Sequence, residues 1–271
     1  MRVALKLGYI GTNYHGFQIQ PDVPTVSSVI LNALEELNII ENRHTAAFSF
    51  AGRTDRGVHA ISQVISFETK NPDISVRMIN SALPDDIFVI AMAYPYQKFN
   101  ARKDALWREY RYFLLDADSS LNIESMRIAS SSLIGVHDFR NFAERDREEK
   151  TTVRHVLRID IKRDGKFIII DVRAHSFLRK MVRKMVTALK IVGECEKPPE
   201  WLSYLLHSPQ HHHIAPAPAC GLLLRDVKYN IEFEYDEYAL NRLKEKLKNE
   251  IFNNLTLSAV FEDMICCCKF P

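Results

Sequence analysis

Residues 51–60 read Ala-Gly-Arg-Thr-Asp-Arg-Gly-Val-His-Ala. The run sets one carboxylate, Asp55, in a turn between two glycines, with Arg53 and Arg56 beside it. Because glycine permits backbone angles and close approaches that other residues resist, a short acidic side chain on such a turn can meet a ligand directly. The neighbouring guanidinium groups can keep the carboxylate ionised and can also hold phosphates. An ordinary surface turn with an Asp–Arg ion pair would give the same pattern, since Asp and Gly are common in turns.

On both sides of this turn, runs typical of strands alternate with patterns typical of amphipathic helices. Strands are predicted at residues 3–9, 45–50, 63–69, 88–94, 109–115, 153–161, 166–172 and 221–228. Helices are predicted at residues 26–37, 75–82, 176–192 and 236–252, the first with Thr25 as its N-cap. Strands and helices occur in both halves of the chain, which predicts an α+β fold with two related lobes.

The boundary between the lobes is expected near residues 100–106. We expect residues 1–104 to form an N-terminal lobe that carries the candidate carboxylate, and residues 105–230 to form a C-terminal lobe with Tyr110 and a basic helix. Residues 231–271 should form a helical extension and tail. Its apolar positions fall on one stripe, which favours a role in packing or in supporting a dimer; they are Leu240, Leu243, Leu247 and Ile251.

Composition narrows the class of protein. The chain has 271 residues, of which 46% are apolar, so it can bury a substantial core. Its net charge is only +2, so any affinity for nucleic acid must come from basic side chains gathered on one face. No run of 18 apolar residues is present and the N-terminus starts as a strand, which predicts no membrane span and favours the cytoplasm. The run Cys266–Cys268 lacks metal-ligand spacing, and we expect these cysteines to be free thiols in a C-terminal tail. The run His211–His213 lies in a Pro-rich loop with no cysteine or carboxylate partner nearby, so we expect solvent-exposed histidines.

Several motifs occur in the order that one enzyme family uses. The run around Asp55 resembles the Arg-Thr-Asp-x-Gly-Val-His-Ala signature of the TruA-type tRNA pseudouridine synthases. The similarity covers about residues 3–229 and includes residues 8–20, 79–87, 99–102, 108–112, 137–142, 177–183 and 215–222. Four positions depart from the family pattern, which puts the position of the substrate in doubt more than catalysis; they are Arg56, Asn100, Arg140 and Asn141.

The resemblance implies a fold and an activity. The fold would be a mostly antiparallel central sheet built from two ferredoxin- or RRM-like halves, with helices on one side and an active-site cleft between the lobes. The activity would be isomerisation of uridine to pseudouridine in the anticodon stem-loop of tRNA, typically at positions 38 to 40. The reaction moves C1′ of the ribose from N1 to C5 of the same base, so no cofactor or metal is expected. The resemblance also implies a homodimer.

The matched motifs assign three catalytic candidates. Asp55 would be the essential carboxylate, and whether it attacks C1′ or takes a proton from the ribose stays open. The Tyr110 ring would stack on the uracil while its hydroxyl assists removal of the C5 proton, although a tyrosine in a strand is more often part of the core. Arg183 would orient the carboxylate through a bidentate contact.

The remaining candidates would bind the RNA. Arg53 is the family's wedge for the flipped base, and a plain phosphate contact is its alternative. Other candidate contacts come from basic side chains near the motifs; they are Arg56, His59, Arg102, Arg111, Arg179, Lys180 and Lys184, with Lys98, Lys103, Arg108 and Arg173 as further phosphate contacts.

Three other functions remain open at this point. A sibling synthase would modify another tRNA position with the same active site. A silent RNA-binding or folding-chaperone protein would bind tRNA in a salt-sensitive way without forming product. A small-molecule hydrolase using Asp55 would have no affinity for tRNA, and the sequence shows no obvious second acid to assist it.

Overall fold

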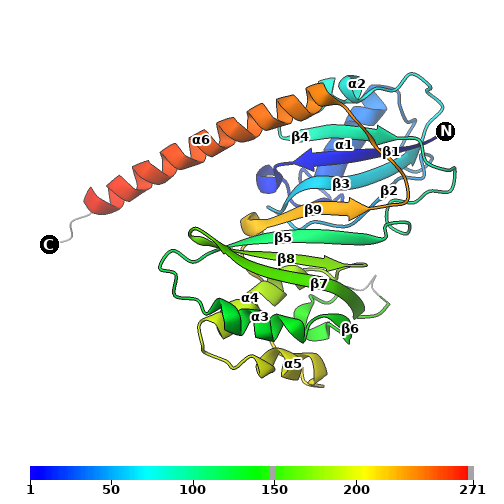
Figure 1. Cartoon of the computed structure of the whole chain (residues 1–271). Helices are drawn as coiled ribbons and strands as arrows, with labels where there is room; N and C mark the ends of the chain where they lie inside the picture. The colour runs from blue at the N-terminus through cyan, green and yellow to red at the C-terminus, as the bar shows by residue number, and fades with distance from the viewer. Residues whose placement is uncertain (147–149, 268–271) are drawn as a thin grey trace.

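A computed structural model describes residues 1–146 and 150–267, and its centre is one ten-stranded sheet (Figure 1). The strand order is β10-β4-β1-β3-β9-β5-β8-β7-β6, with β2 paired to β3. Every pairing is antiparallel except that between β3 and β9, which confirms the mostly antiparallel sheet. The strands are β1 Arg2–Tyr9, β2 Ser49–Phe50, β3 His59–Glu68, β4 Ile87–Ala93, β5 Trp107–Leu115, β6 Gly135–Asp138, β7 Val153–Asp164, β8 Phe167–Ala174, β9 Leu222–Lys228 and β10 Glu234–Tyr235.

Strand β9 joins the two halves of the sheet. On one side it pairs with β3 through Ala60 and Leu224, and on the other side the same Leu224 pairs with Tyr110 of β5. The turn that carries Asp55 leads directly into β3. The turn and Tyr110 therefore come from the two strands that flank β9.

Within the described residues, five α-helices accompany the sheet in addition to the long C-terminal helix. In Figure 1, α1 lies behind the upper strands and α4 behind the lower ones, while α3 packs on α4 and β7. Thr25 caps α1 as predicted, since its side chain accepts from the Ser28 amide and the Ser28 hydroxyl accepts from the Thr25 amide. Helices α3 and α5 were not predicted. The bounds are α1 Val26–Glu36, α2 Val76–Ser81, α3 Ile123–Ser131, α4 Met181–Gly193 and α5 Glu200–His207.

Helix α6, Glu237–Cys267, lies on the other face of the sheet. Successive side chains of a strand point to opposite faces. In β4, Val89 joins the main core, whereas Phe88 and Ile90 pack with Leu243 of α6. The prediction of a helix at 236–252 was correct in type but too short. Cys266 and Cys267 are exposed residues of this helix rather than of a tail, and Cys268 lies outside the described residues.

Two predicted boundaries were wrong for identifiable reasons. The strand expected at 45–50 is reduced to β2, because the Asn42 side chain accepts from the amides of His44 and Thr45 and holds a turn there. The helix expected at 176–192 begins at Met181, because Lys180 has a left-handed backbone with φ 59°. Left-handed residues do not continue an α-helix, so residues 176–180 form a separate loop. No helix in the two described ranges is long and apolar enough to cross a membrane.

Candidate active site

A cavity of about 1150 Å³ opens where the Asp55 turn, β5 and the start of α4 meet. Eight of the eleven predicted site residues line it, although they lie up to 130 residues apart in sequence. They are Arg53, Asp55, Arg56, Arg102, Tyr110, Arg179, Lys180 and Arg183. The fold thus gathers these eight predicted residues around a single hollow, which Lys103, Arg108, Asp146 and Arg154 also line.

Backbone contacts fix the turn that carries Asp55. Its neighbour Thr54 accepts a hydrogen bond from the Phe17 amide at 3.0 Å, and the Thr54 hydroxyl lies 2.8 Å from the Tyr9 hydroxyl. Gly57 has φ +80°, a left-handed value that favours glycine. Gly11 packs so closely against the turn that a Cβ there would lie 2.0 Å from the Val58 carbonyl oxygen. The turn is therefore held from both sides before any ligand arrives.

Arg183 of α4 reaches across the cavity to Asp55. Its Nη1 donates to Asp55 Oδ2 at 2.8 Å, while its Nε donates to the Ala217 carbonyl at 2.6 Å. The side chains are 13% and 22% exposed respectively, so solvent screens this pair only partly. The contact uses one guanidinium nitrogen and is not the expected bidentate one, because the second donor holds the 215–218 loop. One free carboxylate oxygen of Asp55 can therefore serve a substrate.

Tyr110 is buried beneath the turn and contacts Phe177. The two rings meet edge-to-face with centroids 5.1 Å apart. Burial raises the pKa of the Tyr110 hydroxyl, and the nearby Tyr9 and Asp55 raise it further, so the phenol stays protonated at neutral pH. Tyr112, two residues on, is also buried, but its hydroxyl donates to the Pro218 carbonyl at 3.0 Å and it lies outside the cavity lining.

Acidic residues of the 143–146 loop hold two of the cations. Arg53 Nη1 donates to Asp146 Oδ2 at 3.0 Å, and Lys180 Nζ lies 2.5 Å from Glu144 Oε2. The hydrogen bond from Lys180 lowers the pKa of Glu144, with smaller contributions from the charges of Arg179 and Lys184. These ion pairs connect the loop to both sides of the cavity. Sequence analysis missed Glu144 and Asp146, because nothing in their local pattern shows where the loop lies.

Three predicted RNA contacts lie outside the cavity lining. His59 accepts from the Gly11 amide at 3.2 Å, and burial lowers its pKa. Arg111 makes a bidentate ion pair with Asp171, with both N···O distances 2.7 Å. Lys184 is buried and donates to the Ala143 carbonyl at 2.8 Å. All three stabilise the surroundings of the cavity.

Arg108 also has a structural role rather than the predicted phosphate contact. It is only 6% exposed, and its guanidinium donates to backbone carbonyls of several separate segments. The acceptors are Ala51, Arg102, Ala105 and His175. An exposed position is needed to reach a phosphate, and the alternating pattern of β5 places Arg108 on the buried face. Arg56, Arg102 and Arg179, in contrast, are exposed at the rim.

Comparison with known proteins identifies the class. A family model described as tRNA pseudouridine synthase matches residues 7–102 and 129–230. The chain is 44% identical over 269 residues to tRNA pseudouridine synthase A of Methanosarcina acetivorans, covering 98% of this chain and 99% of the relative. It is 45% identical over 251 residues to the enzyme of the same name from Methanothermobacter thermautotrophicus, covering 92% and 90% respectively. A chain in a solved structure of a Cbf5–Nop10–Gar1 complex is 14% identical, with a TM-score of 0.37; the match covers 70% of this chain and 45% of that chain.

The chain belongs to the tRNA pseudouridine synthase family. It is an isomerase of the TruA type, as the motifs predicted.

Proposed function

We propose that the enzyme isomerises uridines of the anticodon stem-loop, at positions 38 to 40, with Asp55 as the essential carboxylate. The observation that carries the proposal is the ion pair between Asp55 and Arg183 at 2.8 Å inside the cavity. The pair fixes an ionised carboxylate at the one place where the turn, β5 and α4 converge. The uridine positions rest on the motif resemblance.

The carboxylate would act at the sugar of the target uridine. The N1–C1′ bond breaks, the uracil turns, the C5–C1′ bond forms, and C5 loses its proton. Asp55 either attacks C1′ or removes a proton from the ribose, and its second oxygen is available for either role. Arg183 would hold the carboxylate in one rotamer throughout, since it is itself held by the Ala217 carbonyl.

Tyr110 would form the floor under the flipped uracil. A flat aromatic face contributes about 1–3 kcal/mol per stacked base. Because the hydroxyl is protonated, it would donate a hydrogen bond and pass on the C5 proton only after transferring its own. The edge-to-face contact with Phe177 keeps the ring in place.

The cations at the cavity would bind the tRNA backbone. Arg53 would leave Asp146 and enter the gap that the flipped base creates, at a cost of a few kcal/mol for unstacking. Arg56, Arg102 and Arg179 at the rim would contact phosphates. The homodimer that the family resemblance implies and the cytoplasmic location that the sequence favours complete the proposal.

Position mapping tests the choice of uridine. Carbodiimide modification and primer extension on a treated tRNA transcript should mark positions 38 to 40. A matched transcript with cytidine at these positions should show no mark. Marks elsewhere on both transcripts would support the sibling synthase and overturn this choice.

A further inference from the structure

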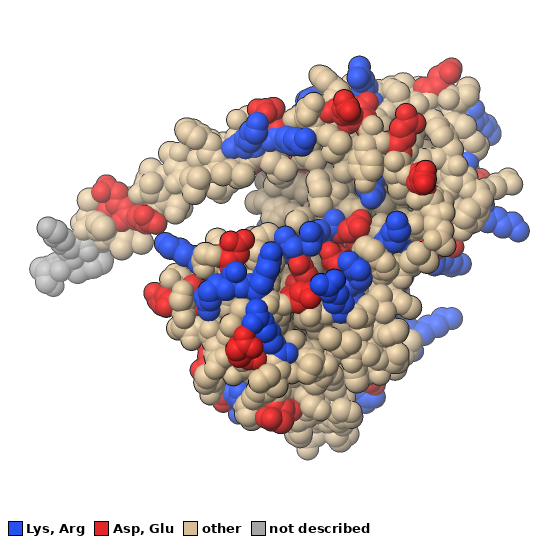
Figure 2. Space-filling view, viewed as in Figure 1, with Lys and Arg blue, Asp and Glu red and all other residues tan. Residues whose placement is uncertain are grey.

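Arg108 has no acid beside it, unlike the arginines on the opposite face of the sheet. Figure 2 shows basic and acidic side chains interspersed on that face, where Arg111 lies 2.7 Å from Asp171 and Arg173 lies 2.6 Å from Glu109. Arg108 is buried on the face that carries α4, and within residues 1–146 and 150–267 no carboxylate forms an ion pair with it. Taking a charge out of water is costly, so this guanidinium must be compensated in another way.

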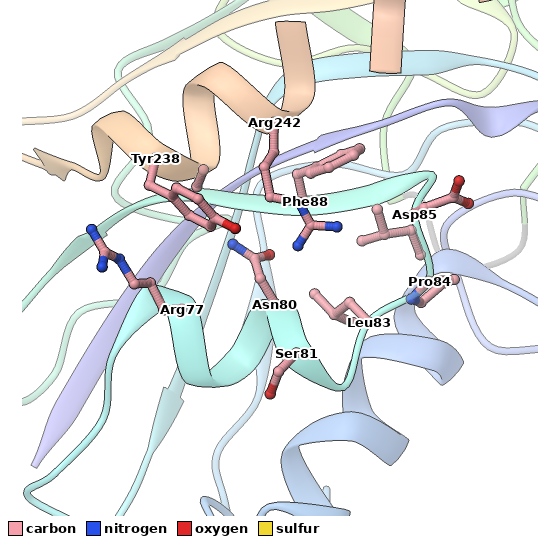
Figure 3. Close-up of a pocket in the computed structure, with 11 residues that line it drawn as sticks. Arg77, Asn80, Ser81, Leu83, Pro84, Asp85, Phe88, Tyr238 and Arg242 are labelled. Atoms are coloured by element: carbon pink, nitrogen blue, oxygen red, sulfur yellow. The ribbon is translucent and has the colours of Figure 1, made fainter. Parts of the chain in front are cut away.

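The small pocket between α2 and α6 shows how different a surface arginine is. Its volume is about 190 Å³, and Figure 3 shows Arg77 and Arg242 at its rim. Both residues are exposed, and Arg77 Nε lies 3.5 Å from Asp236 Oδ2. Water already solvates these cations, so neither their charge nor their ion pair requires a special role.

Backbone carbonyls compensate the charge of Arg108. Its Nε and Nη2 both donate to the Ala51 carbonyl, at 3.2 and 2.8 Å. The other acceptors are the carbonyls of Arg102 at 2.5 Å, His175 at 2.5 Å and Ala105 at 3.4 Å. These five hydrogen bonds use every N–H donor that a guanidinium has. Arg108 lines the cavity but has no donor left for a substrate.

Two of the acceptors belong to opposite walls of the cavity. Ala51 lies in the N-terminal half of the sheet, four residues before Asp55. His175 lies in the C-terminal half, directly after β8 and two residues before Phe177. The Phe177 ring in turn contacts Tyr110. One planar group therefore ties the turn that carries the carboxylate to the segment that holds the tyrosine.

We propose that Arg108 is a positioning residue for the isomerisation. By holding Ala51 and His175 together, it sets the distance between the Asp55 turn and the Tyr110 ring. An apolar side chain would fill the same space without the cost of a buried charge. Only the rigid fork of an arginine fixes several acceptors in one plane. The inference rests on the proposed function, because it assumes that Asp55 acts on the ribose.

Kinetics of Arg108→Lys test the proposal. A lysine ammonium keeps the charge, but it donates from one point and cannot hold all the carbonyls. Because a displacement of about 1 Å can cost about 100-fold in rate, kcat for tritium release from tRNA should fall about 10- to 100-fold. KM should change little, since Arg108 has no donor left for tRNA. Arg108→Gln is a second variant that removes the buried charge and so spares the fold, and its kcat should fall as well.

Arg2→Lys is the matched control. Arg2 is also buried, and its guanidinium donates to the carbonyls of Phe99 and Ala47 at 2.7 and 2.9 Å, outside the cavity lining. Both lysine variants should lower the melting temperature, but Arg2→Lys should keep the wild-type kcat well below its own melting temperature. Equal losses of kcat in the two lysine variants, a wild-type kcat in both Arg108 variants, or a loss confined to KM would overturn the proposal.

Asp55→Asn, measured alongside, separates this inference from the proposed function. If Asp55→Asn is inactive while both Arg108 variants are fully active, only the positioning role is refuted. If Asp55→Asn is as active as wild type, the essential carboxylate is refuted, and the positioning of its turn with it.

Discussion

Replacing Arg183 with lysine keeps the charge but removes the geometry that holds Asp55. Arg183 donates through Nη1 to Asp55 and through Nε to the Ala217 carbonyl, and a lysine ammonium cannot reproduce both directions from one point. A hydrogen bond to a charged group contributes about 1.5–3 kcal/mol. Since about 1.36 kcal/mol is tenfold in rate, kcat for tRNA should fall about 10- to 150-fold.

The assay is initial-rate tritium release from tRNA that carries 5-tritiated uridine, at several tRNA concentrations. KM should change little, because Arg183 faces the carboxylate and not the rim of the cavity. Arg179→Lys is the control: Arg179 lies in the 176–180 loop before α4, is exposed, and its Nε lies 3.8 Å from Glu144 Oε2. Equal losses of kcat in the two variants, or a loss confined to KM in Arg183→Lys, would refute the positioning role.

Two further predictions concern the scaffold around the turn. Burial lowers the pKa of His59 below its ordinary value of 6.5, so the unfolded chain binds more protons than the folded one and stability should fall as pH drops through 6.5. The melting temperature of His59→Gln should therefore decline less between pH 7.5 and 5.5 than that of wild type. His44 is exposed, so the melting temperature of His44→Gln should decline as that of wild type does. Gly11→Ala should lower the melting temperature by about 2–12 °C, from about 1–3 kcal/mol of overpacking against the Val58 carbonyl. Gly52→Ala, in the Asp55 turn itself, should lower the melting temperature much less, because a Cβ at Gly52 would lie 4.0 Å from its nearest neighbour, the Tyr110 hydroxyl. Equal effects of the two substitutions would contradict the close packing of Gly11.

The sequence was most informative where local chemistry determines local structure. Thr25 marked the start of α1, and β7 and β8 form a hairpin where strands were predicted at 153–161 and 166–172. The left-handed backbone of Lys180 was not predictable from the sequence, because lysine has no local preference for that conformation and the surrounding packing imposes it. The unpredicted helix α3 shows only a weak amphipathic pattern, as it packs on α4 through a few small and apolar residues.

The residues of the candidate site were also predictable only in part. Motif order identified residues 128 positions apart, Asp55 and Arg183, that the fold brings to 2.8 Å. The local pattern did not separate Arg108 of β5, which holds backbone carbonyls, from Arg102, which lies in the preceding loop at the rim. That distinction depends on which side chains the assembled fold buries.

Comparing wild type and Asp55→Asn for tritium release from tRNA tests whether Asp55 is the essential carboxylate. Asparagine keeps the size and can still hydrogen-bond, so loss of the charge is isolated from loss of the fold. We expect release by wild type and none above background by Asp55→Asn, with tRNA binding retained. Equal release by both would contradict the assignment of Asp55, and no release by either despite tight tRNA binding would favour an RNA-chaperone role.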